Sequence, residues 1–260
     1  MNNLFIKDLF ESSRLKFFWL KLSWLEFYGW YGRLNLGLAW VIISPAIFSL
    51  GISVVYAEAF GSSLWEHFLY VYGGYVCWLF IAETLSNGAE IYNSAYSYYS
   101  ETKLPLVGFN LKGTLVRSYT LGLNTIAFVI VALFSGEGIN FLLIPILLVL
   151  LLSLSLTTSI VLSISFAYFP DLKLIIQNTM RLLFFLTPIV WVPNEELKGI
   201  KAILVYANPF YYVVESYRQL ISSDIDFYHF YILSVILSAM IVLSMVLYNM
   251  FSRKMVFVCK

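Results

Sequence analysis

The sequence predicts an all-α integral membrane protein that crosses the bilayer six times and forms a single domain over residues 1–260. Hydrophobic residues make up 60% of the chain and charged residues only 12%, whereas about a quarter of the residues in a soluble protein are charged. The mean hydropathy is +0.82. The apolar residues also come in blocks of about 20, the length that a helix needs to cross a hydrocarbon core about 30 Å thick.

Six such blocks lie between residues 36 and 250, and we predict a span in each. Pro45 lies inside the first block and Pro188 inside the fifth. Proline is tolerated in membrane helices because neighbouring groups satisfy the freed backbone, so neither residue excludes a span. The predicted spans cover residues 36–60, 68–92, 115–134, 141–166, 174–192 and 227–250.

The orientation follows from the lysines and arginines in the connections, because these residues gather on the cytoplasmic side. Thirteen fall in the N-terminal segment, the second and fourth connections and the C-terminal tail, and three fall in the fifth connection. We therefore expect a multi-pass protein of the cytoplasmic (inner) membrane with both termini in the cytoplasm. The thirteen are Lys7, Arg14, Lys16, Lys21, Arg33, Lys103, Lys112, Arg117, Lys173, Arg181, Arg253, Lys254 and Lys260, and the three are Lys198, Lys201 and Arg218.

Two segments outside the predicted spans have a character of their own. Residues 1–33 mix charges at helical spacing with aromatic residues, which predicts an amphipathic helix that lies in the membrane interface. The fifth connection, residues 193–226, holds two short apolar pieces divided by Asn208 and Pro209. Each piece is too short to span. They are either short re-entrant helices before the last span or helices at the surface, and the sequence leaves both open.

The sequence indicates no chemistry of its own. Gly108 and Gly113 have the spacing of a phosphate loop, but the lysine that would reach the phosphates is missing. His67 and His229 are isolated, and two cysteines do not make a disulfide framework. We therefore expect no catalytic residue, no metal site and no cofactor in this chain. No basic tract suggests a nucleic acid partner.

The second predicted span and the aromatic content suggest a path for a substrate. Charged groups at membrane depth usually face the bundle interior or a wet cavity, and Glu83 is such a group. Aromatic rings pack against the apolar faces of sugars, and 18% of the chain is aromatic. On the second span we expect one helical face to carry Tyr72, Tyr75, Leu79, Glu83, Asn87 and Glu90. The candidate substrate path comprises Tyr72, Tyr75, Trp78, Glu83, Trp191, Phe210, Tyr211, Tyr212, Glu215, Tyr217 and Arg218.

Four stretches resemble one family of membrane proteins. Residues 33–45, RLNLGLAWVIISP, are similar to the entrance to the first span of ABC-2 type transporter permeases that export O-antigen, capsule or teichoic acid polysaccharides. Residues 72–80, 169–193 and 208–221 resemble later parts of the same permeases in the same order. The residues that carry this resemblance are Arg33, Gly37, Trp40, Pro45, Pro170, Pro188, Asn208 and Pro209.

The resemblance implies a homodimer with a channel between its two copies, which binds two copies of a separate ATPase subunit. That subunit would bind the ATP and Mg²⁺. The substrate would be a lipid-linked glycan of O-antigen or capsule type, and the two short pieces before the last span would line the external mouth. The interfacial helix and the loop 94–109 would contact the ATPase, with the coupling residues Tyr98, Tyr99, Glu101, Lys103 and Pro105.

Three other functions share some of these features. An ABC-2 type exporter of drugs or small amphiphiles would have the same topology, and the substrate distinguishes it. A membrane-embedded transferase acting on a lipid-linked substrate needs convergent polar residues, of which the sequence offers few. A secondary transporter commonly shows duplicated halves and intramembrane ion sites, which this sequence lacks. Either of these last two would work without ATP hydrolysis by a partner.

Overall fold

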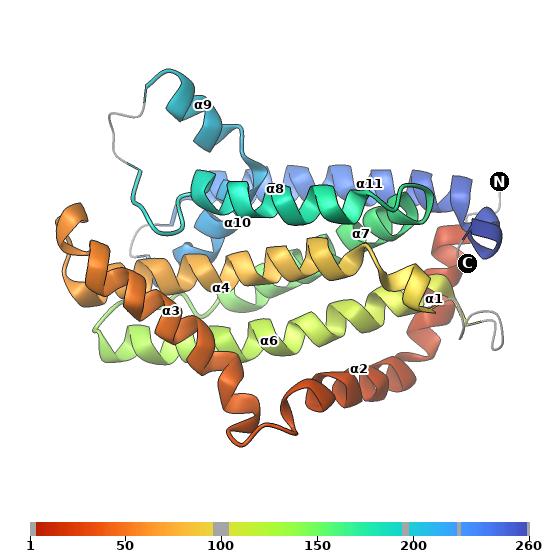
Figure 1. Ribbon diagram of the computed structural model, residues 1–260, viewed down its shortest axis with the longest axis horizontal. Coiled ribbons are helices and arrows are strands. Elements are labelled where there is room, and N and C mark those ends of the chain that lie inside the picture. The colour runs from red at the N-terminus through yellow and green to blue at the C-terminus, as the bar shows by residue number, and fades with distance from the viewer. Residues whose placement is uncertain (1–3, 96–103, 194–197, 223–224, 259–260) are drawn as a thin grey trace.

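The computed structural model describes residues 4–95, 104–193, 198–222 and 225–258. Within these ranges the protein is all helical, without a strand, as predicted. Five helical segments are long and apolar enough to cross a membrane, and they run side by side (Figure 1). They are Gly37–Tyr56, which joins the turn η1 (Gly37–Ala39) to α3 (Trp40–Tyr56), then α4 (Leu64–Gly88), α6 (Leu106–Phe134), α7 (Leu143–Tyr168) and Phe227–Ser252 of α11 (Phe227–Val258).

The predicted fifth span corresponds to α8 (Leu172–Leu186), which has 15 residues. At 1.5 Å per residue the helix is about 22 Å long, shorter than a hydrocarbon core of about 30 Å. It ends before Pro188 because the residue before a proline is pushed out of the helical conformation, and Thr187 is extended. A crossing by residues 174–192 therefore stays a prediction, and it would need the non-helical residues after α8.

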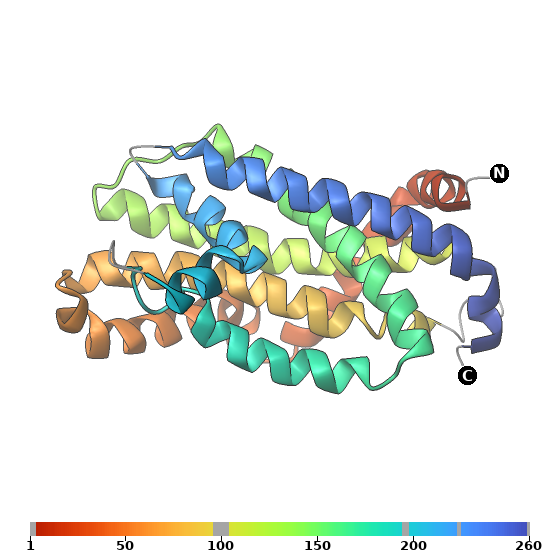
Figure 2. The same cartoon turned by 90° about the horizontal axis from the view of Figure 1, so that it is seen from above.

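The N-terminal segment forms two helices rather than one. The chain breaks at Leu15 between α1 (Leu4–Arg14) and α2 (Lys16–Tyr31). α1 lies across the end of the bundle, whereas α2 runs obliquely along its flank and makes an elbow with α3 (Figures 1 and 2). Gly37 has a φ of +52° in this elbow, a backbone conformation that favours glycine.

α2 is docked on the spanning helix α6. Trp19 is fully buried against Gly108, where the Cβ of any larger residue would stand 2.1 Å from the indole ring. Glu26 forms an ion pair of 2.6 Å with Lys112 of α6. The segment predicted to lie in the interface is thus held on the bundle through specific contacts, and its place relative to a membrane stays a prediction.

The third predicted span begins earlier than expected, because α6 starts nine residues before position 115. Lys112 and Arg117 therefore lie within a helix rather than in a cytoplasmic connection. Arg117 is buried among α4, α6 and α7 and says nothing about orientation. Arg218, counted among the external charges, is likewise buried. A bias of twelve basic residues against two remains.

The two short pieces of the fifth connection are present as α9 (Ile200–Tyr206) and α10 (Pro209–Arg218). The Asn208 side chain accepts a hydrogen bond of 3.0 Å from the backbone N–H of Phe210 and so caps α10. α10 packs against α4 and α11, and its Val213 and Val214 belong to the main hydrophobic core. The depth of these helices in a membrane is untested.

Candidate functional site

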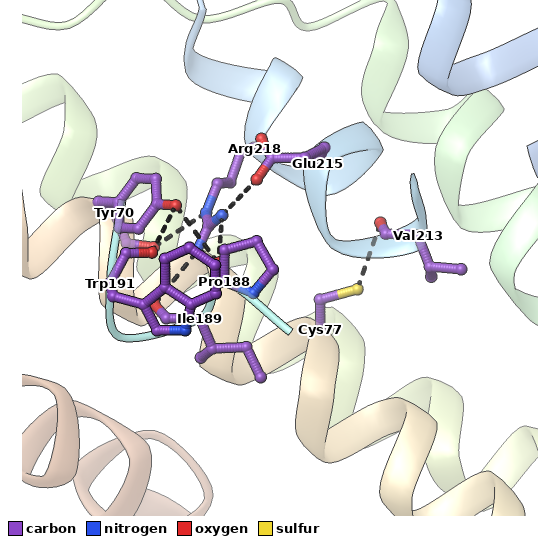
Figure 3. Close-up of polar contacts among 8 residues, drawn as sticks. All are labelled: Tyr70, Cys77, Pro188, Ile189, Trp191, Val213, Glu215 and Arg218. Atoms are coloured by element: carbon purple, nitrogen blue, oxygen red, sulfur yellow. Dashed lines mark hydrogen bonds and ion pairs between the residues drawn. The ribbon is translucent and has the colours of Figure 1, made fainter. Parts of the chain in front are cut away.

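Arg218 at the end of α10 forms the centre of a buried polar cluster, which we call the Arg218 bracket (Figure 3). Its guanidinium donates to the backbone carbonyls of Tyr70 (3.1 Å), Pro188 (2.9 Å) and Ile189 (3.2 Å), and Nη1 also contacts the Glu215 carboxylate at 2.5 Å. The guanidinium lies 3.5 Å from the centroid of the Tyr70 ring. The bracket ties α4, the turn after α8 and α10 into one unit.

Two residues of α4 make room for the bracket. At Gly74 an added Cβ would stand 2.3 Å from Nη2 of Arg218, so a glycine is required for the guanidinium to fit. Cys77 donates a 3.5 Å hydrogen bond to the carbonyl of Val213, one turn before the arginine. Gly73 and Gly74 thus leave room for neighbouring side chains, those of Phe128 and Arg218 respectively.

The bracket engages two residues of the candidate substrate path. Glu215 and Arg218 pair with each other, and the bonds to the carbonyls of Tyr70, Pro188 and Ile189 use three further donors of the arginine. Only 8% of the Arg218 side chain and 16% of the Glu215 side chain are exposed. In this conformation neither residue is free to bind sugar hydroxyls.

Half of the eight aromatic residues of the candidate path are buried inside the protein. Tyr72 donates to Asn124 (3.2 Å), and the hydroxyl of Tyr217 lies 2.9 Å from that of Thr125. Both tyrosines are in the core between α4, α6 and α10. Tyr72 thus turns toward α6, the side on which Glu83 also lies, whereas Tyr75 turns toward α3 and α8. Trp78 and Tyr212 are also buried, and Tyr212 donates to the carbonyl of Tyr206, whereas Trp191 is partly exposed and donates to the carbonyl of Phe185.

A second group of aromatic residues is only partly covered. Tyr75 stacks on Phe48 of α3 with ring centroids 4.1 Å apart, and it meets Phe184 of α8 edge to face. Phe210 and Tyr211 at the start of α10 are also partly exposed. Tyr75 thus lies where α3, α4 and α8 meet on one side of the bundle. We call this side the α3–α4–α8 face (Figure 2).

Glu83 lines a cavity of about 190 Å³ between α3, α4 and α6. The wall includes the polar side chains of Thr120 and Asn124 from α6 and of Ser44 from α3. Pro45 and Trp40, two of the residues that carry the resemblance, also line it. A carboxylate beside hydroxyl and amide groups offers hydrogen bonds to a hydroxyl-rich ligand.

A buried polar stripe on α6, which was not predicted from the sequence, contributes Thr120 and Asn124 to the wall of this cavity and continues beyond it. Arg117 donates to Ser155 (3.0 Å) and Thr114 (3.3 Å). It makes no ion pair within 4.0 Å in the described part of the chain, although the charge of Glu83 is close enough to act on it. The signal was present as polar residues at steps of three or four: Asn110, Thr114, Arg117, Thr120 and Asn124.

The α3–α4–α8 face also displays polar residues on α8. Gln177, Asn178 and Arg181 are exposed, and no carboxylate lies within 4.0 Å of Arg181 in the described ranges. α8 contacts α4 through Phe184 with Tyr75 at one end, and at the other end Lys173 forms an ion pair with Glu90, two residues after α4. The exposed polar residues are therefore level with the spanning helix α4.

The coupling residues of the sequence analysis are mostly not described. Tyr98, Tyr99, Glu101 and Lys103 lie outside the described residues. Pro105 is the extended residue at which α6 begins. Next to it, the carboxylate of Asp8 in α1 accepts hydrogen bonds from the hydroxyl of Tyr248 in α11 and from the backbone N–H of Leu106. Burial raises the pKa of this carboxyl group, and the bond from Tyr248 opposes that rise.

The remaining residues of the resemblance have structural places. Arg33 is exposed in the elbow before Gly37, and Pro170 lies in the turn between α7 and α8. The Asn208 amide donates to the hydroxyl of Thr187 at 2.8 Å, which ties the start of α10 to the turn at Pro188. Pro209 is the first residue of α10.

Within the described ranges, no group of three or more histidine, cysteine, aspartate or glutamate side chains is placed to hold a metal ion. The chain matches no protein-family model, and no curated protein shows significant similarity to it.

Proposed function

We propose that the chain is the membrane subunit of an ATP-driven exporter that moves a lipid-linked polysaccharide of O-antigen or capsule type across the cytoplasmic membrane. In this proposal two copies form a homodimer with the glycan path between them. A separate ATPase subunit, also in two copies, binds ATP and Mg²⁺ and hydrolyses the ATP. The chain itself is a permease and carries no catalytic residue.

The observation that carries the proposal is the chemistry of the α3–α4–α8 face. Polar side chains level with a spanning helix are costly against lipid, so they usually face a partner or a water-filled cavity. At this face α8 exposes Gln177, Asn178 and Arg181 beside apolar residues, and α4 contributes the partly covered ring of Tyr75. Two copies that turn this face toward each other would enclose a polar path with aromatic walls, which suits a sugar chain.

The Arg218 bracket adds support for the resemblance. Three of the four stretches that resemble the polysaccharide permeases meet in it, through Gly74, Pro188 and Arg218. Residues from these three stretches thus depend on one another for packing, which gives a physical reason for the three stretches to occur in one chain. The fourth stretch reaches the neighbouring cavity through Trp40 and Pro45.

The proposed division of labour places the ATPase at the end of the bundle that carries both termini. The end of α4 and the start of α6 lie there, and the segment 94–109 would dock in the ATPase. Cysteines placed along residues 98–104 should then crosslink to the ATPase subunit. Crosslinks confined to the C-terminal tail would contradict this docking site.

Water access to the α3–α4–α8 face tests the proposal directly. Single cysteines at Gln177 and Asn178, in a chain with Cys77→Ala and Cys259→Ser, should react with a charged thiol reagent. Matched cysteines at Ile126 and Val242, exposed on α6 and α11 at 59% and 61%, should face lipid and stay unreactive. The face is lipid-exposed, and the path is misplaced, if positions 177 and 178 react no faster than the two controls.

The substrate is tested by export of the glycan itself. Tyr75→Leu keeps an apolar side chain but removes the ring, so it should lower export if the ring contacts sugar, while Tyr75→Ala should lower it at least as much. Full rescue by leucine would mean that Tyr75 only packs against Phe48 and Phe184. Export of small amphiphiles with no effect on the glycan would favour the drug-exporter alternative.

A further inference from the structure

The charged residues of α1, α2 and the elbow are segregated by sign. Each carboxylate has a partner within the protein: Asp8 accepts from Tyr248, Glu26 pairs with Lys112 at 2.6 Å, and Glu11 pairs with Lys7 at 3.8 Å. Two of these three partners belong to spanning helices, so the negative charges turn toward the bundle. The acidic residues of this segment are therefore all hydrogen-bonded or ion-paired within the protein.

The remaining basic residues have no such partner. Arg14, Lys16, Lys21 and Arg33 are exposed, and none has a carboxylate within 4.0 Å in the described part of the chain. Arg14 and Lys16 instead lie over aromatic rings of their own helices, Phe10 at 4.6 Å and Phe17 at 5.3 Å. Four positive charges thus point away from the bundle without compensation.

Large apolar side chains lie between these charges on the same helices. Phe17 is 76% exposed, and Trp24, Leu25 and Tyr28 are about half exposed. Exposed aromatic residues mixed with cations suit the interface of a bilayer, where rings lie among the headgroups and cations meet lipid phosphates. The helix α1 lies across the end of the bundle rather than along it, a place that suits a helix at a membrane surface (Figure 1).

We propose that this surface, the basic aromatic face formed by Arg14, Lys16, Lys21, Arg33 and the rings between them, binds the anionic headgroups of phospholipids. Uncompensated cations distinguish such lipids from neutral ones, because a basic residue near an anionic surface contributes about 1 kcal/mol. Binding would hold α1, α2 and the elbow against the membrane surface. It depends on no property of the exported substrate.

Fluorescence quenching by brominated lipid tests this inference. The chain, with Leu20→Cys labelled in a Cys77→Ala, Cys259→Ser background, is reconstituted in phosphatidylcholine that contains either brominated phosphatidylglycerol or brominated phosphatidylcholine. Leu20 is 40% exposed on α2 between Lys16 and Lys21. The brominated anionic lipid should quench the probe at a lower mole fraction than the brominated neutral lipid does. The mole fraction needed should fall by roughly fivefold for each basic residue that binds a headgroup.

Two controls separate this result from general membrane contact. A probe at Phe134, 89% exposed at the far end of α6, should show no preference between the two lipids. Lys16→Gln with Lys21→Gln should lose most of the preference at Leu20, whereas Arg181→Gln with Lys198→Gln should keep it. Equal quenching by both lipids at Leu20 would overturn the inference. Absence of quenching by either would show that a protein partner covers the face, and would overturn it too.

Discussion

Replacement of Gly74 by alanine tests the Arg218 bracket with the smallest possible change. The new Cβ would stand 2.3 Å from Nη2 and 3.1 Å from Cζ of Arg218, whereas nonbonded atoms pack at about 3.5–4 Å. The guanidinium must therefore shift by about 1 Å or more. It cannot do so and keep its bonds to the carbonyls of Tyr70 and Ile189, which are already 3.1 and 3.2 Å long.

The expected cost follows from these two bonds. A hydrogen bond from a charged donor contributes about 1.5–3 kcal/mol, so losing both costs about 3–6 kcal/mol. Alanine has a higher helix propensity than glycine and returns about 1 kcal/mol. We therefore expect Gly74→Ala to lower the free energy of unfolding by about 2–5 kcal/mol.

The assay is chemical unfolding of the purified protein in detergent micelles, with Gly122→Ala as the matched control. Gly122 lies in the middle of α6 and has no atom within 4 Å of an added Cβ, so this variant should gain up to about 1 kcal/mol. In an Arg218→Met background the cost of Gly74→Ala should largely disappear, because the two effects share one contact. Equal stability of Gly74→Ala and Gly122→Ala would refute the bracket as described.

Three further predictions concern other parts of the fold. Cysteines at Ser62 and Gly138 should react with an impermeant thiol reagent from outside the cell, and labelling only from the inside would reverse the topology. Trp19→Ala should lower the free energy of unfolding by about 3–5 kcal/mol and expose α2 to protease, whereas the half-exposed Trp24→Ala should not. Asp8→Asn keeps an acceptor for Tyr248 but removes the buried charge. Burial raises the pKa of the Asp8 carboxyl group, so this group binds its proton more tightly in the native chain than in the unfolded one. The free energy of unfolding of the unmodified protein, relative to that of Asp8→Asn, should therefore fall as the pH rises through the raised pKa.

The helical fold was predictable because apolar length alone marks a span, and α4, α7 and α11 lie where their blocks predicted. The start of α6 was not. Lys112 and Arg117 were assigned to a cytoplasmic loop because both are charged. Their partners lie far away in the sequence: Lys112 pairs with Glu26, and Arg117 donates to Ser155. The neighbouring sequence gives no sign of these contacts. The orientation rule counts lysines and arginines in the connections and takes no account of such tertiary contacts.

The candidate site shows the same limit. The pairing of Glu215 with Arg218 follows from helical spacing, but the carbonyl at Pro188 that completes the bracket comes from a turn that the sequence analysis placed inside a span. Tyr72 was assigned to the face of Tyr75 because three residues separate them. It turns instead toward Asn124, since α6 offers a buried partner there. Helical periodicity narrows the choice of face, and tertiary packing decides it.

The most direct test of the proposed function is the energy source of transport. Inverted membrane vesicles from cells with and without the chain are loaded with a radiolabelled lipid-linked glycan on their outer, cytoplasmic leaflet. ATP should drive the glycan into the lumen only when the chain is present, and the movement should continue after an uncoupler collapses the proton gradient. Movement that ignores ATP and stops with the uncoupler would contradict the account.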